Sequence, residues 1–326
     1  MIRQPNRLNS GSVGTNSCMA TAGGLFAFDA VAAAGGYTDN CLGSVTAVET
    51  GTEVVTGTDC AWIVTYTFSV QDACGNILPG QTYTHTGSDQ TAPTLTGVPF
   101  AGTTGTNACM ANAATAAPFI GASAILGYTD NCLGVVTATL TGTAVTGTDC
   151  SWTVTYTFTI LDECLNSFPG QTYANTGSDL TAPVITTGTI ASCYPTVAEA
   201  EAAALLATTE IDDCPGVITE TASTVGTCSA VVTVTETDGC GNVSSTTYTT
   251  RIDNTAPVIT TGTIASCYPT VAEAEAAALL ATTEIDDCPG VITETASTVG
   301  TCSAVVTVTE TDGCGNVLDD IRYTDR

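Results

Sequence analysis

Four cysteines recur in the same order four times along this chain of 326 residues. The first set returns 90 to 91 residues later, and the third set returns after 74 residues. The four sets are Cys18, Cys41, Cys60 and Cys74; Cys109, Cys132, Cys150 and Cys164; Cys193, Cys214, Cys228 and Cys240; and Cys267, Cys288, Cys302 and Cys314. A period of this size indicates tandem structural units. We therefore expect the chain to fold repeat by repeat.

A short junction motif marks the boundaries between these units. It reads Asp-x-Thr-Ala-Pro and begins at Asp89, Asp179 and Asp253. Its proline fixes an extended backbone and cannot donate a hydrogen bond to a central sheet. The expected domains are therefore residues 1–90, 91–180, 181–254 and 255–326. Residues 181–243 and 255–317 are identical, so the last two domains are close copies.

Alternation of apolar and polar residues predicts β-strands. In residues 61–70, Trp62, Val64, Tyr66, Phe68 and Val70 fall on one face, with threonine and serine opposite. A period of two over this length is typical of a half-buried strand. Further strands are expected at residues 44–54, 135–145, 151–160, 217–221, 230–237 and 244–252.

One helix interrupts the strand pattern in the third and fourth repeats. Thr196 precedes Glu199 by three residues, the spacing of a capping box, and alanine-rich sequence follows to about Ala207. The same pattern recurs after Thr270. The matching segments of the first two repeats are glycine-rich and less regular. The first repeat also shows no good candidate for a first strand.

These patterns predict an all-β protein of four tandem immunoglobulin-like β-sandwich domains, with a short helix in repeats three and four. Units of 74 to 91 residues have small cores, so disulfides would add stability. Each repeat allows three pairings. An immunoglobulin-like path favours first-to-third and second-to-fourth pairing. The expected bridges are Cys18–Cys60, Cys41–Cys74, Cys109–Cys150, Cys132–Cys164, Cys193–Cys228, Cys214–Cys240, Cys267–Cys302 and Cys288–Cys314.

The charge excludes several classes of partner. The formal net charge is −27, with five arginines and no lysine, whereas nucleic-acid and anionic-membrane binding need clustered cations. The longest apolar run, near residues 198–207, contains Glu199 and Glu201, so no membrane insertion is expected. The single histidine, His85, has no partner constellation in the second repeat, and we expect it at the surface. We therefore expect no enzymatic activity.

The cysteines also indicate the compartment. An even, regularly spaced set without histidine partners favours disulfides over zinc and hence an extracellular or cell-surface location. Residues 1–14 lack the apolar segment of a secretory signal. We interpret them as part of a mature or longer chain.

The recurring motifs resemble a known module family. Asp-Asn-Cys, then Val-Thr-Tyr-Thr-Phe, then Asp-x-Cys-Gly-Asn, then Asp-x-Thr-Ala-Pro resembles the hyalin-repeat-like, immunoglobulin-fold modules of large bacterial surface adhesins and gliding-associated filaments. The resemblance covers all four repeats. It implies an extracellular spacer or adhesive fibre, commonly held at the cell surface.

Acidic loops form the candidate metal sites. Aspartates precede the second and fourth cysteine of each repeat, and a further aspartate stands at each junction. Three such oxygen donors at one domain junction would suit Ca²⁺, which takes six to eight oxygen ligands. The alternative is that these aspartates only organise turns. The candidates are Asp39, Asp72, Asp89, Asp130, Asp162, Asp179, Asp212, Asp238, Asp253, Asp286 and Asp312.

The arginines suggest a mode of assembly. Arg3, Arg7, Arg322 and Arg326 lie near the two ends of the sequence given. We hypothesise that these segments meet the acidic loops of a neighbouring copy, with a terminal segment supplying the missing first strand. The alternative is that both segments are merely polar.

Together these features predict a structural extracellular protein, a disulfide-stapled stalk or a subunit of a surface filament that associates with itself. The alternative is an adhesin that binds surface glycans through loops of repeats one and two. In that case Trp62 and Trp152 would be sugar-stacking platforms, whereas the structural prediction places both in the core.

Overall fold

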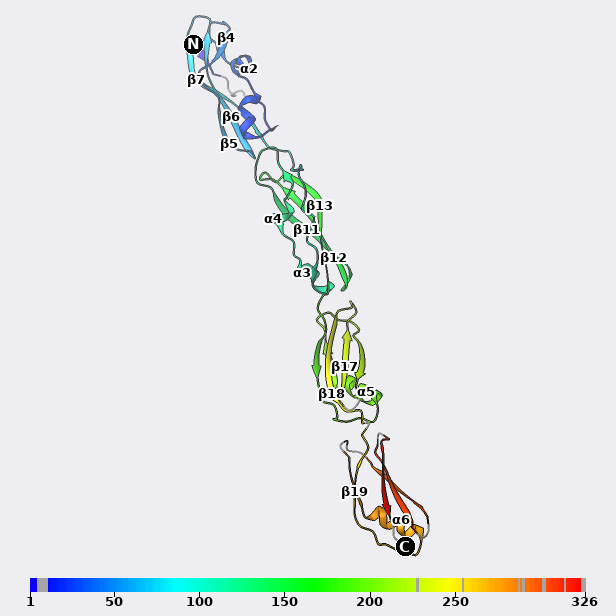
Figure 1. Ribbon diagram of the computed structural model, residues 1–326. Coiled ribbons are helices and arrows are strands. Elements are labelled where there is room, and N and C mark those ends of the chain that lie inside the picture. The colour runs from blue at the N-terminus through cyan, green and yellow to red at the C-terminus, as the bar shows by residue number, and fades with distance from the viewer. Residues whose placement is uncertain are drawn as a thin grey trace. The chain divides into compact units, whose positions relative to one another are not determined.

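The computed structural model describes residues 1–4, 11–226, 229–253, 255–286, 288, 291–300, 303–313 and 315–323 (Figure 1). The chain divides into two compact units, Met1–Ser178 and Asp179–Arg326. Each unit contains two of the predicted repeats. The fold is mainly β, with short helices.

The first repeat has a five-stranded sheet in the order β2-β7-β6-β4, with β5 also paired to β6. A separate pair of short strands, β1 and β3, is antiparallel. Its elements are β1 (Ile2–Arg3), β2 (Thr15–Asn16), α1 (Met19–Leu25), α2 (Ala30–Ala34), β3 (Thr38–Asp39), β4 (Val45–Glu49), β5 (Val54–Thr58), β6 (Ala61–Asp72) and β7 (Ile77–Ser88).

The second repeat has the same plan. Its main sheet runs β11-β12-β13-β9, and β8 pairs with β10. Its elements are β8 (Thr94–Leu95), β9 (Thr106–Asn107), η1 (Met110–Asn112), α3 (Ala113–Ala116), α4 (Gly121–Ala124), β10 (Tyr128–Thr129), β11 (Thr137–Thr148), β12 (Ser151–Leu161) and β13 (Ser167–Ser178).

The third and fourth repeats each combine a three-stranded antiparallel sheet, a two-stranded sheet and one helix. The third contains β14 (Val184–Thr187), α5 (Val197–Ala207), β15 (Thr208–Ile211), β16 (Thr219–Val225), β17 (Ala230–Thr237) and β18 (Val243–Thr250). The fourth contains β19 (Val258–Thr261), α6 (Val271–Leu280), β20 (Thr282–Ile285), β21 (Thr293–Val299), β22 (Val305–Thr311) and β23 (Val317–Tyr323).

The alternating pattern of the central strands places one face of each main sheet in a core. Along β6 every second residue from Trp62 to Asp72 is buried, and β12 repeats this from Trp152 to Ile160. Helices pack on the same face, as Ala200 and Ala204 of α5 do in the third repeat. Four separate apolar clusters result in the described chain, one within each predicted domain range.

The capped helix forms as the sequence predicts. The Thr196 hydroxyl accepts a hydrogen bond from the Glu199 backbone N–H (3.2 Å) at the start of α5, and Thr270 does the same for Glu273 (3.3 Å) at the start of α6. Both threonines have extended backbones, as N-cap residues do. In the first two repeats the irregular segments also contain short helices, which the sequence did not predict.

The first repeat has its own first strand, which corrects the prediction that none is present. Ile2 and Arg3 pair with Asp39 and Thr38, as Thr94 and Leu95 pair with the equivalent segment of the second repeat. Two residues are enough for this short ladder, so no apolar strand pattern is needed. The hypothesis that another segment supplies this strand therefore loses its basis.

The disulfides connect successive repeats, and this corrects the predicted pairing. Cys18 is bonded to Cys132, Cys60 to Cys164, and Cys193 to Cys288. Cys41, Cys74 and Cys267 are free thiols. The incorrect predictions are Cys18–Cys60, Cys41–Cys74, Cys132–Cys164, Cys193–Cys228, Cys267–Cys302 and Cys288–Cys314. Of these residues, Cys228, Cys302 and Cys314 lie outside the described part of the chain.

The pairing between repeats depends on which end of a repeat carries each cysteine-bearing loop. The first and third cysteines of repeat one lie at the end that repeat two meets with its second and fourth cysteines. Cys193 of repeat three meets Cys288 of repeat four in the same way, and the Cα atoms of each bonded pair are 4.9 to 5.8 Å apart. Cys109, Cys150, Cys214 and Cys240 are also disulfide-bonded. The predicted pairs Cys109–Cys150 and Cys214–Cys240 are equivalent to pairs that are wrong elsewhere in the chain.

Disulfides of this number form and persist in oxidising compartments, which is compatible with a secreted protein. Among the helices that the structure describes, none has the length and apolar character of a membrane span.

Candidate metal centre

The aspartates before the fourth cysteine organise their own loops. In each repeat one carboxylate accepts hydrogen bonds from both the backbone and the side-chain amide of an asparagine four residues later, at 2.7 to 2.9 Å. The pairs are Asp72–Asn76, Asp162–Asn166, Asp238–Asn242 and Asp312–Asn316. These bonds from Asn76 hold the pKa of Asp72 below its ordinary value. Burial works against the Asp238 carboxylate, but its loop hydrogen bonds still lower its pKa. For these four residues the turn interpretation accounts for the geometry.

The junction aspartates are buried. Asp89, Asp179 and Asp253 are each 5% exposed or less. Each accepts a hydrogen bond from the backbone N–H of the threonine two residues later, at 2.9 to 3.1 Å. The Asp-x-Thr-Ala-Pro motif thus forms a small turn that holds a carboxylate inside the junction.

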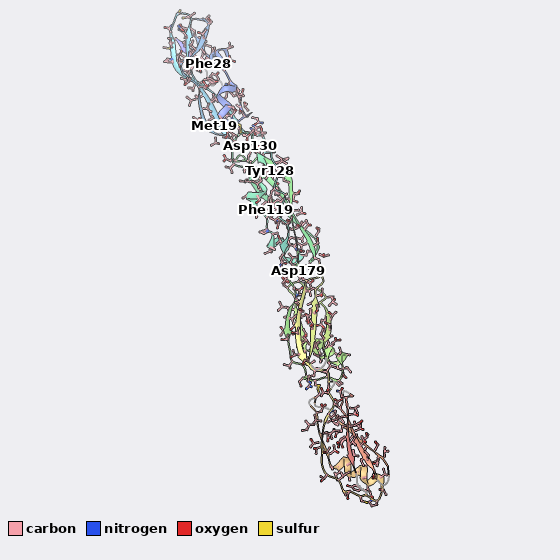
Figure 2. The ribbon with its side chains drawn as sticks, in the orientation of Figure 1. Met19, Phe28, Phe119, Tyr128, Asp130 and Asp179 are labelled. Atoms are coloured by element: carbon pink, nitrogen blue, oxygen red, sulfur yellow. A yellow bond between two sulfur atoms is a disulfide. The ribbon has the colours of Figure 1, made fainter. Side chains whose placement is uncertain are left out.

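In the first unit, these loops come together around Asp130. The pocket at the boundary of repeats one and two is lined by Asp59, Asp89, Asp130, Asp162 and Glu163, among others. Asn131 connects the two repeats by donating to a carboxylate oxygen of Asp89 (3.3 Å). Figure 2 labels Asp130 at this boundary. The predicted grouping of a junction aspartate with two loop aspartates is present here.

Asp130 carries the strongest signal for a cation. Its Oδ2 accepts a bond from the Cys132 N–H (3.0 Å), whereas its Oδ1 is buried without a hydrogen-bond partner. Burial raises the pKa of Asp130, and the negative charges of Asp89 and Asp162 raise it further. A bound cation would relieve both effects.

Related groupings occur in the second unit. Burial raises the pKa of Asp212, and the charges of Asp179, Asp213 and Asp238 add to this effect. Farther along, the side-chain amide of Asn316 donates to both Asp253 and Asp312, at 3.2 and 2.8 Å. One carboxylate oxygen of Asp253 is buried without a hydrogen-bond partner.

The first repeat differs. Asp39 lies next to the amino group of Met1, which it contacts at 3.3 Å. Asp72 is occupied by Asn76 in its loop, as described above. Asp39 thus has a cationic neighbour where its equivalent, Asp130, lies near the charge of Asp89. Asp72 has the same asparagine neighbour as its equivalent, Asp162.

The donor set around Asp130 fits a hard cation. Carboxylate oxygens are the ligands that Ca²⁺ takes in greatest number. Cys18 and Cys132 lie within the same group but are bonded to each other and offer no thiolate. Ca²⁺ at Asp89, Asp130 and Asp162 therefore stays a prediction, with the buried Asp130 oxygen as its structural basis.

The arginines proposed for assembly are only partly described. Arg3 lies in β1, and Arg322 lies in β23 opposite Val306. Arg7 and Arg326 lie outside the described residues. The assembly role of the arginines stays a prediction.

Sequence reasoning missed the aspartate before the third cysteine. Asp59 accepts a hydrogen bond from the Met19 N–H (2.6 Å), and Asp149 accepts one from the Met110 N–H (2.7 Å). Each bond fixes the segment that follows the first cysteine. The signal was the exact repetition of Thr-Gly-Thr-Asp-Cys at residues 56–60 and 146–150.

His85 is buried, which corrects the prediction of a surface histidine. Its ring stacks on Phe26, with centroids 4.0 Å apart, and its Nδ1 accepts a hydrogen bond from the Ser12 N–H (2.9 Å). In the second repeat the Asn175 side chain accepts the equivalent bond from the Thr103 N–H (2.8 Å). The two residues replace each other because both offer one buried acceptor at this position.

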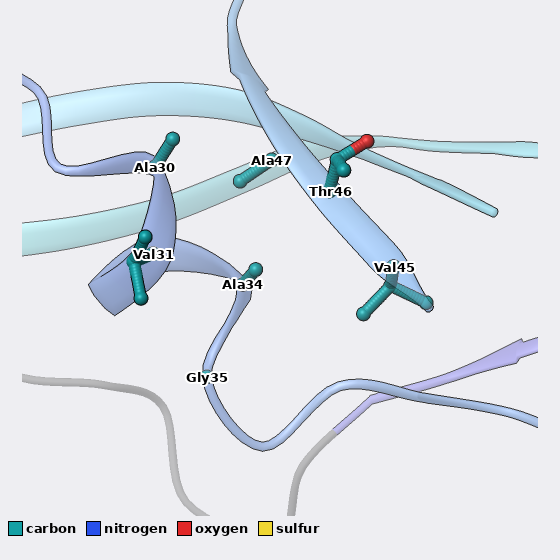
Figure 3. Close-up of a pocket in the computed structure, with 7 residues that line it drawn as sticks. All are labelled: Ala30, Val31, Ala34, Gly35, Val45, Thr46 and Ala47. Carbon is teal, nitrogen blue, oxygen red and sulfur yellow. The ribbon is translucent and has the colours of Figure 1, made fainter. Parts of the chain in front are cut away.

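A shallow pocket in the first repeat lies between α2 and β4. Ala30, Val31 and Ala34 line one side, and Val45 and Ala47 line the other (Figure 3). Thr46 brings the one side-chain hydroxyl among the lining residues, and none of them is aromatic, so the pocket offers no stacking surface for a sugar. Trp62 and Trp152, each 1% exposed, are core residues as the structural prediction expects.

A scan against protein-family models gives no match to this chain, and neither does a comparison with curated proteins.

Proposed function

We propose that this chain is an extracellular structural protein, a stalk or a subunit of a surface filament, whose modules are coupled to one another by disulfides. The observation that supports this is the direction of the bridges. Cys18–Cys132, Cys60–Cys164 and Cys193–Cys288 each run from one repeat to the next. A bridge of this kind carries tension between modules, whereas a bridge inside a module only stabilises that module.

The same proposal takes each repeat to be an immunoglobulin-like module. Each repeat buries one face of a mainly antiparallel sheet and carries a second, two-stranded sheet, which suits a module of an adhesin-type array. The glycan-binding adhesin stays an alternative, and a glycan array with the intact chain separates the two.

The proposal is tested by pulling single molecules of the full chain by its two ends. In the oxidised protein, Cys18–Cys132 and Cys60–Cys164 cross the boundary of repeats one and two, and Cys193–Cys288 crosses that of repeats three and four, so the segments between these bridged cysteines cannot extend. We expect a much shorter maximum extension before reduction than after it. Equal extension of oxidised and reduced chains would contradict the proposal that the bridges carry tension between modules.

A matched variant sharpens this test. Replacing Cys18 and Cys60 with serine removes both bridges between repeats one and two and should release the first unit. Replacing Cys41 and Cys74, which are free thiols, should change nothing.

A further inference from the structure

Three glutamates of the third repeat stand at positions that are apolar or aromatic in the first two repeats. The positions lie four residues before and six residues after the second cysteine, and four residues before the fourth. The third repeat has Glu210, Glu220 and Glu236 there, where the first has Tyr37, Ala47 and Val70 and the second has Tyr128, Ala138 and Ile160. Within each of the first two repeats, the three residues lie in or against one apolar cluster. The three positions therefore meet inside the module.

The strands of the third repeat bring the three glutamates together. Glu220 of β16 is directly opposite Glu236 of β17 in the antiparallel pair, so both side chains lie on the same face, with Cβ atoms about 4.5 to 5.5 Å apart. Glu210 belongs to β15, in the separate two-stranded sheet. Burial raises the pKa of Glu236, and the negative charges of Glu210 and Glu220 raise it further, as neighbouring carboxylates do. Both sheets of the repeat therefore contribute to one acidic cluster.

Glu236 is the member of this cluster that the fold leaves without a partner. It lies on the same face of β17 as Val232 and Val234, and its side chain is 0% exposed. Both of its carboxylate oxygens are buried without a hydrogen-bond partner among the described residues. A carboxylate buried in this way is costly unless an opposite charge or a hydrogen-bond donor compensates it. Its position between two further carboxylates points to a cation as the missing partner.

A fourth oxygen donor lies on the other side of Glu236. Ser244 of β18 is directly opposite Glu236, and its hydroxyl is also buried with no hydrogen-bond partner in the part of the chain that the structure describes. The equivalent residues are Leu78 in the first repeat, Phe168 in the second and Leu318 in the fourth. Three adjacent strands of the third repeat thus place oxygen donors in one row, where the first two repeats bury apolar side chains.

We propose that the third repeat binds one Ca²⁺ ion inside the module, with the carboxylates of Glu210, Glu220 and Glu236 and the hydroxyl of Ser244 as its protein ligands. Three carboxylates offer six oxygens and the hydroxyl offers a seventh, within the range of six to eight that Ca²⁺ takes. The ion supplies the positive charge that Glu236 lacks. The site belongs to a single repeat, so it does not depend on the proposed function of the whole chain.

The donor set and the burial favour Ca²⁺ over other common divalent cations. Zn²⁺ is held mainly by cysteine sulfur and histidine nitrogen, whereas the four positions offer only oxygen. Mg²⁺ dehydrates reluctantly and usually keeps several waters, which a carboxylate that is 0% exposed does not suit. Ca²⁺ accepts protein oxygens in a flexible geometry. The fourth repeat has the same three glutamates but Leu318 opposite Glu310, so the proposal is made for the third repeat.

The experiment measures amide hydrogen exchange of the full chain at neutral pH, first in chelator and then with added CaCl₂. The amides of β18 are followed because residues 244–250 are unique to the third repeat, whereas any peptide within residues 181–243 occurs twice in the chain. At a free Ca²⁺ concentration 100 times the dissociation constant, we expect exchange that requires opening of the site to slow about 100-fold. Exchange that CaCl₂ leaves unchanged would overturn the proposal, and equal slowing by MgCl₂ would overturn the choice of cation.

Substitutions at the site give the sharper test. Glu236→Gln keeps the shape of the side chain but removes its charge, and should abolish the calcium-dependent slowing in β18. The matched control is Glu310→Gln, which makes the same change in the identical strand of the fourth repeat and should leave the β18 response unaltered. Ser244→Ala should shift the response to higher Ca²⁺ concentrations, because one neutral ligand is lost and three carboxylates remain. A response that survives Glu236→Gln contradicts the proposal.

Two further outcomes separate a calcium ligand from other roles. In chelator, Glu236→Gln should exchange no faster than the wild type, because without the ion the buried charge only costs stability. Faster exchange there would show that Glu236 stabilises the fold through protein contacts, and would overturn the proposal. Loss of the response in Asp179→Asn together with its retention in Glu236→Gln would assign the ion to the junction instead.

Discussion

The repeats of the first and second units share one order of cysteines but have different cores. In the first unit the central strand carries aromatic residues, and Phe28 and Phe119 (labelled in Figure 2) each contact three further aromatic rings. In the second unit the equivalent cores consist mainly of alanine and valine, with Tyr248 and Ile252 in the third repeat. The loops and the cysteine framework are shared, whereas the packing is not.

One position makes the contrast plain. Val70 and Ile160 are fully buried in the first unit, and the aligned residues of the second unit are Glu236 and Glu310, also fully buried. Both Glu236 carboxylate oxygens lack a hydrogen-bond partner. Burial raises the pKa of Glu236, and Glu210 and Glu220 raise it further. The comparison teaches that bridges between repeats can coexist with a core that tolerates a buried acid.

The largest effect is expected when a glutamate is placed in the aromatic core of the first unit, at the position where the second unit has one. We expect Val70→Glu to destabilise the first unit by about 4 kcal/mol or more, because its apolar neighbours cannot solvate a carboxylate. Urea unfolding followed by tryptophan fluorescence checks this, since both tryptophans lie in the first unit. Val70→Ala provides the control for lost volume. Unfolding of Val70→Glu at the wild-type urea concentration would contradict the explanation.

Removing a bridge should have the next largest effect. Cys18→Ser/Cys132→Ser opens a link between residues 114 apart in sequence, and we expect a loss of about 2 to 4 kcal/mol in the first unit. The matched control is Cys41→Ser, which alters a free thiol in an identical loop. A similar loss in both variants would show that the loop, rather than the bridge, supplies the stability.

Calcium should stabilise the boundary of repeats one and two. At a free concentration 100 times the dissociation constant, a single site adds about 2.7 kcal/mol, measured as a rise in melting temperature that a chelator reverses. Asp130→Asn should abolish the response. Asp39→Asn, at the equivalent position of the first repeat beside the Met1 amino group, should preserve it. If Asp130→Asn leaves the rise in melting temperature unaltered, calcium binds at a site that does not include Asp130.

Exchanging the buried acid for an apolar residue should bring the second unit closer to the first. We expect Glu236→Val to stabilise repeat three by about 1 to 2 kcal/mol at neutral pH. Because the folded pKa of Glu236 is raised, the folded wild type binds a proton before the unfolded chain does. The wild type therefore gains stability as the pH falls from neutral through the folded pKa, and the variant lacks this gain. Hydrogen exchange of the β17 amides measures both, with Glu236→Gln as the control for charge alone.

The smallest effect concerns His85. Burial lowers its pKa, so the unfolded chain binds a proton at a higher pH than the folded chain does. The contribution of the neutral ring is fully present above pH 6.5 and is lost as the pH falls from there through the folded pKa. His85→Asn copies Asn175 and should remove this part of the pH dependence. An unchanged pH profile of Trp62 fluorescence would contradict the assignment.

The sequence predicts where helices and strands lie, but it does not predict which cysteines are bonded to each other. Period-two alternation from Trp62 to Val70 locates β6, and the Thr196 cap locates α5, because both signals depend on local geometry. The bridges are different. In a periodic sequence the second cysteine of the same repeat and that of the next look alike, as the identical segments around Cys41 and Cys132 show. Local sequence therefore cannot choose between pairing within a repeat and pairing between repeats.

In the candidate site and the buried core, too, some features could be predicted from local sequence and others could not. The grouping of Asp89, Asp130 and Asp162 could be predicted because loops at one end of a module must meet the chain that enters there. The buried carboxylate of Glu236 could not, because Glu236 follows the buried Val232 and Val234 on the same face of β17, yet a glutamate near the end of a strand is ordinarily expected in solvent. Burial of a single acid depends on the opposite layer, which the strand pattern does not contain.

The direction of the bridges has a consequence for inheritance. Each described bridge joins the first or third cysteine of one repeat to the second or fourth cysteine of the next. A gene that gains or loses one whole repeat by unequal recombination therefore still encodes partners for cysteines bonded in this way. Residues 181–243 and 255–317 are identical, so such an exchange also leaves the meeting surfaces unaltered. Chain length can then vary in steps of one module without producing a stranded internal thiol.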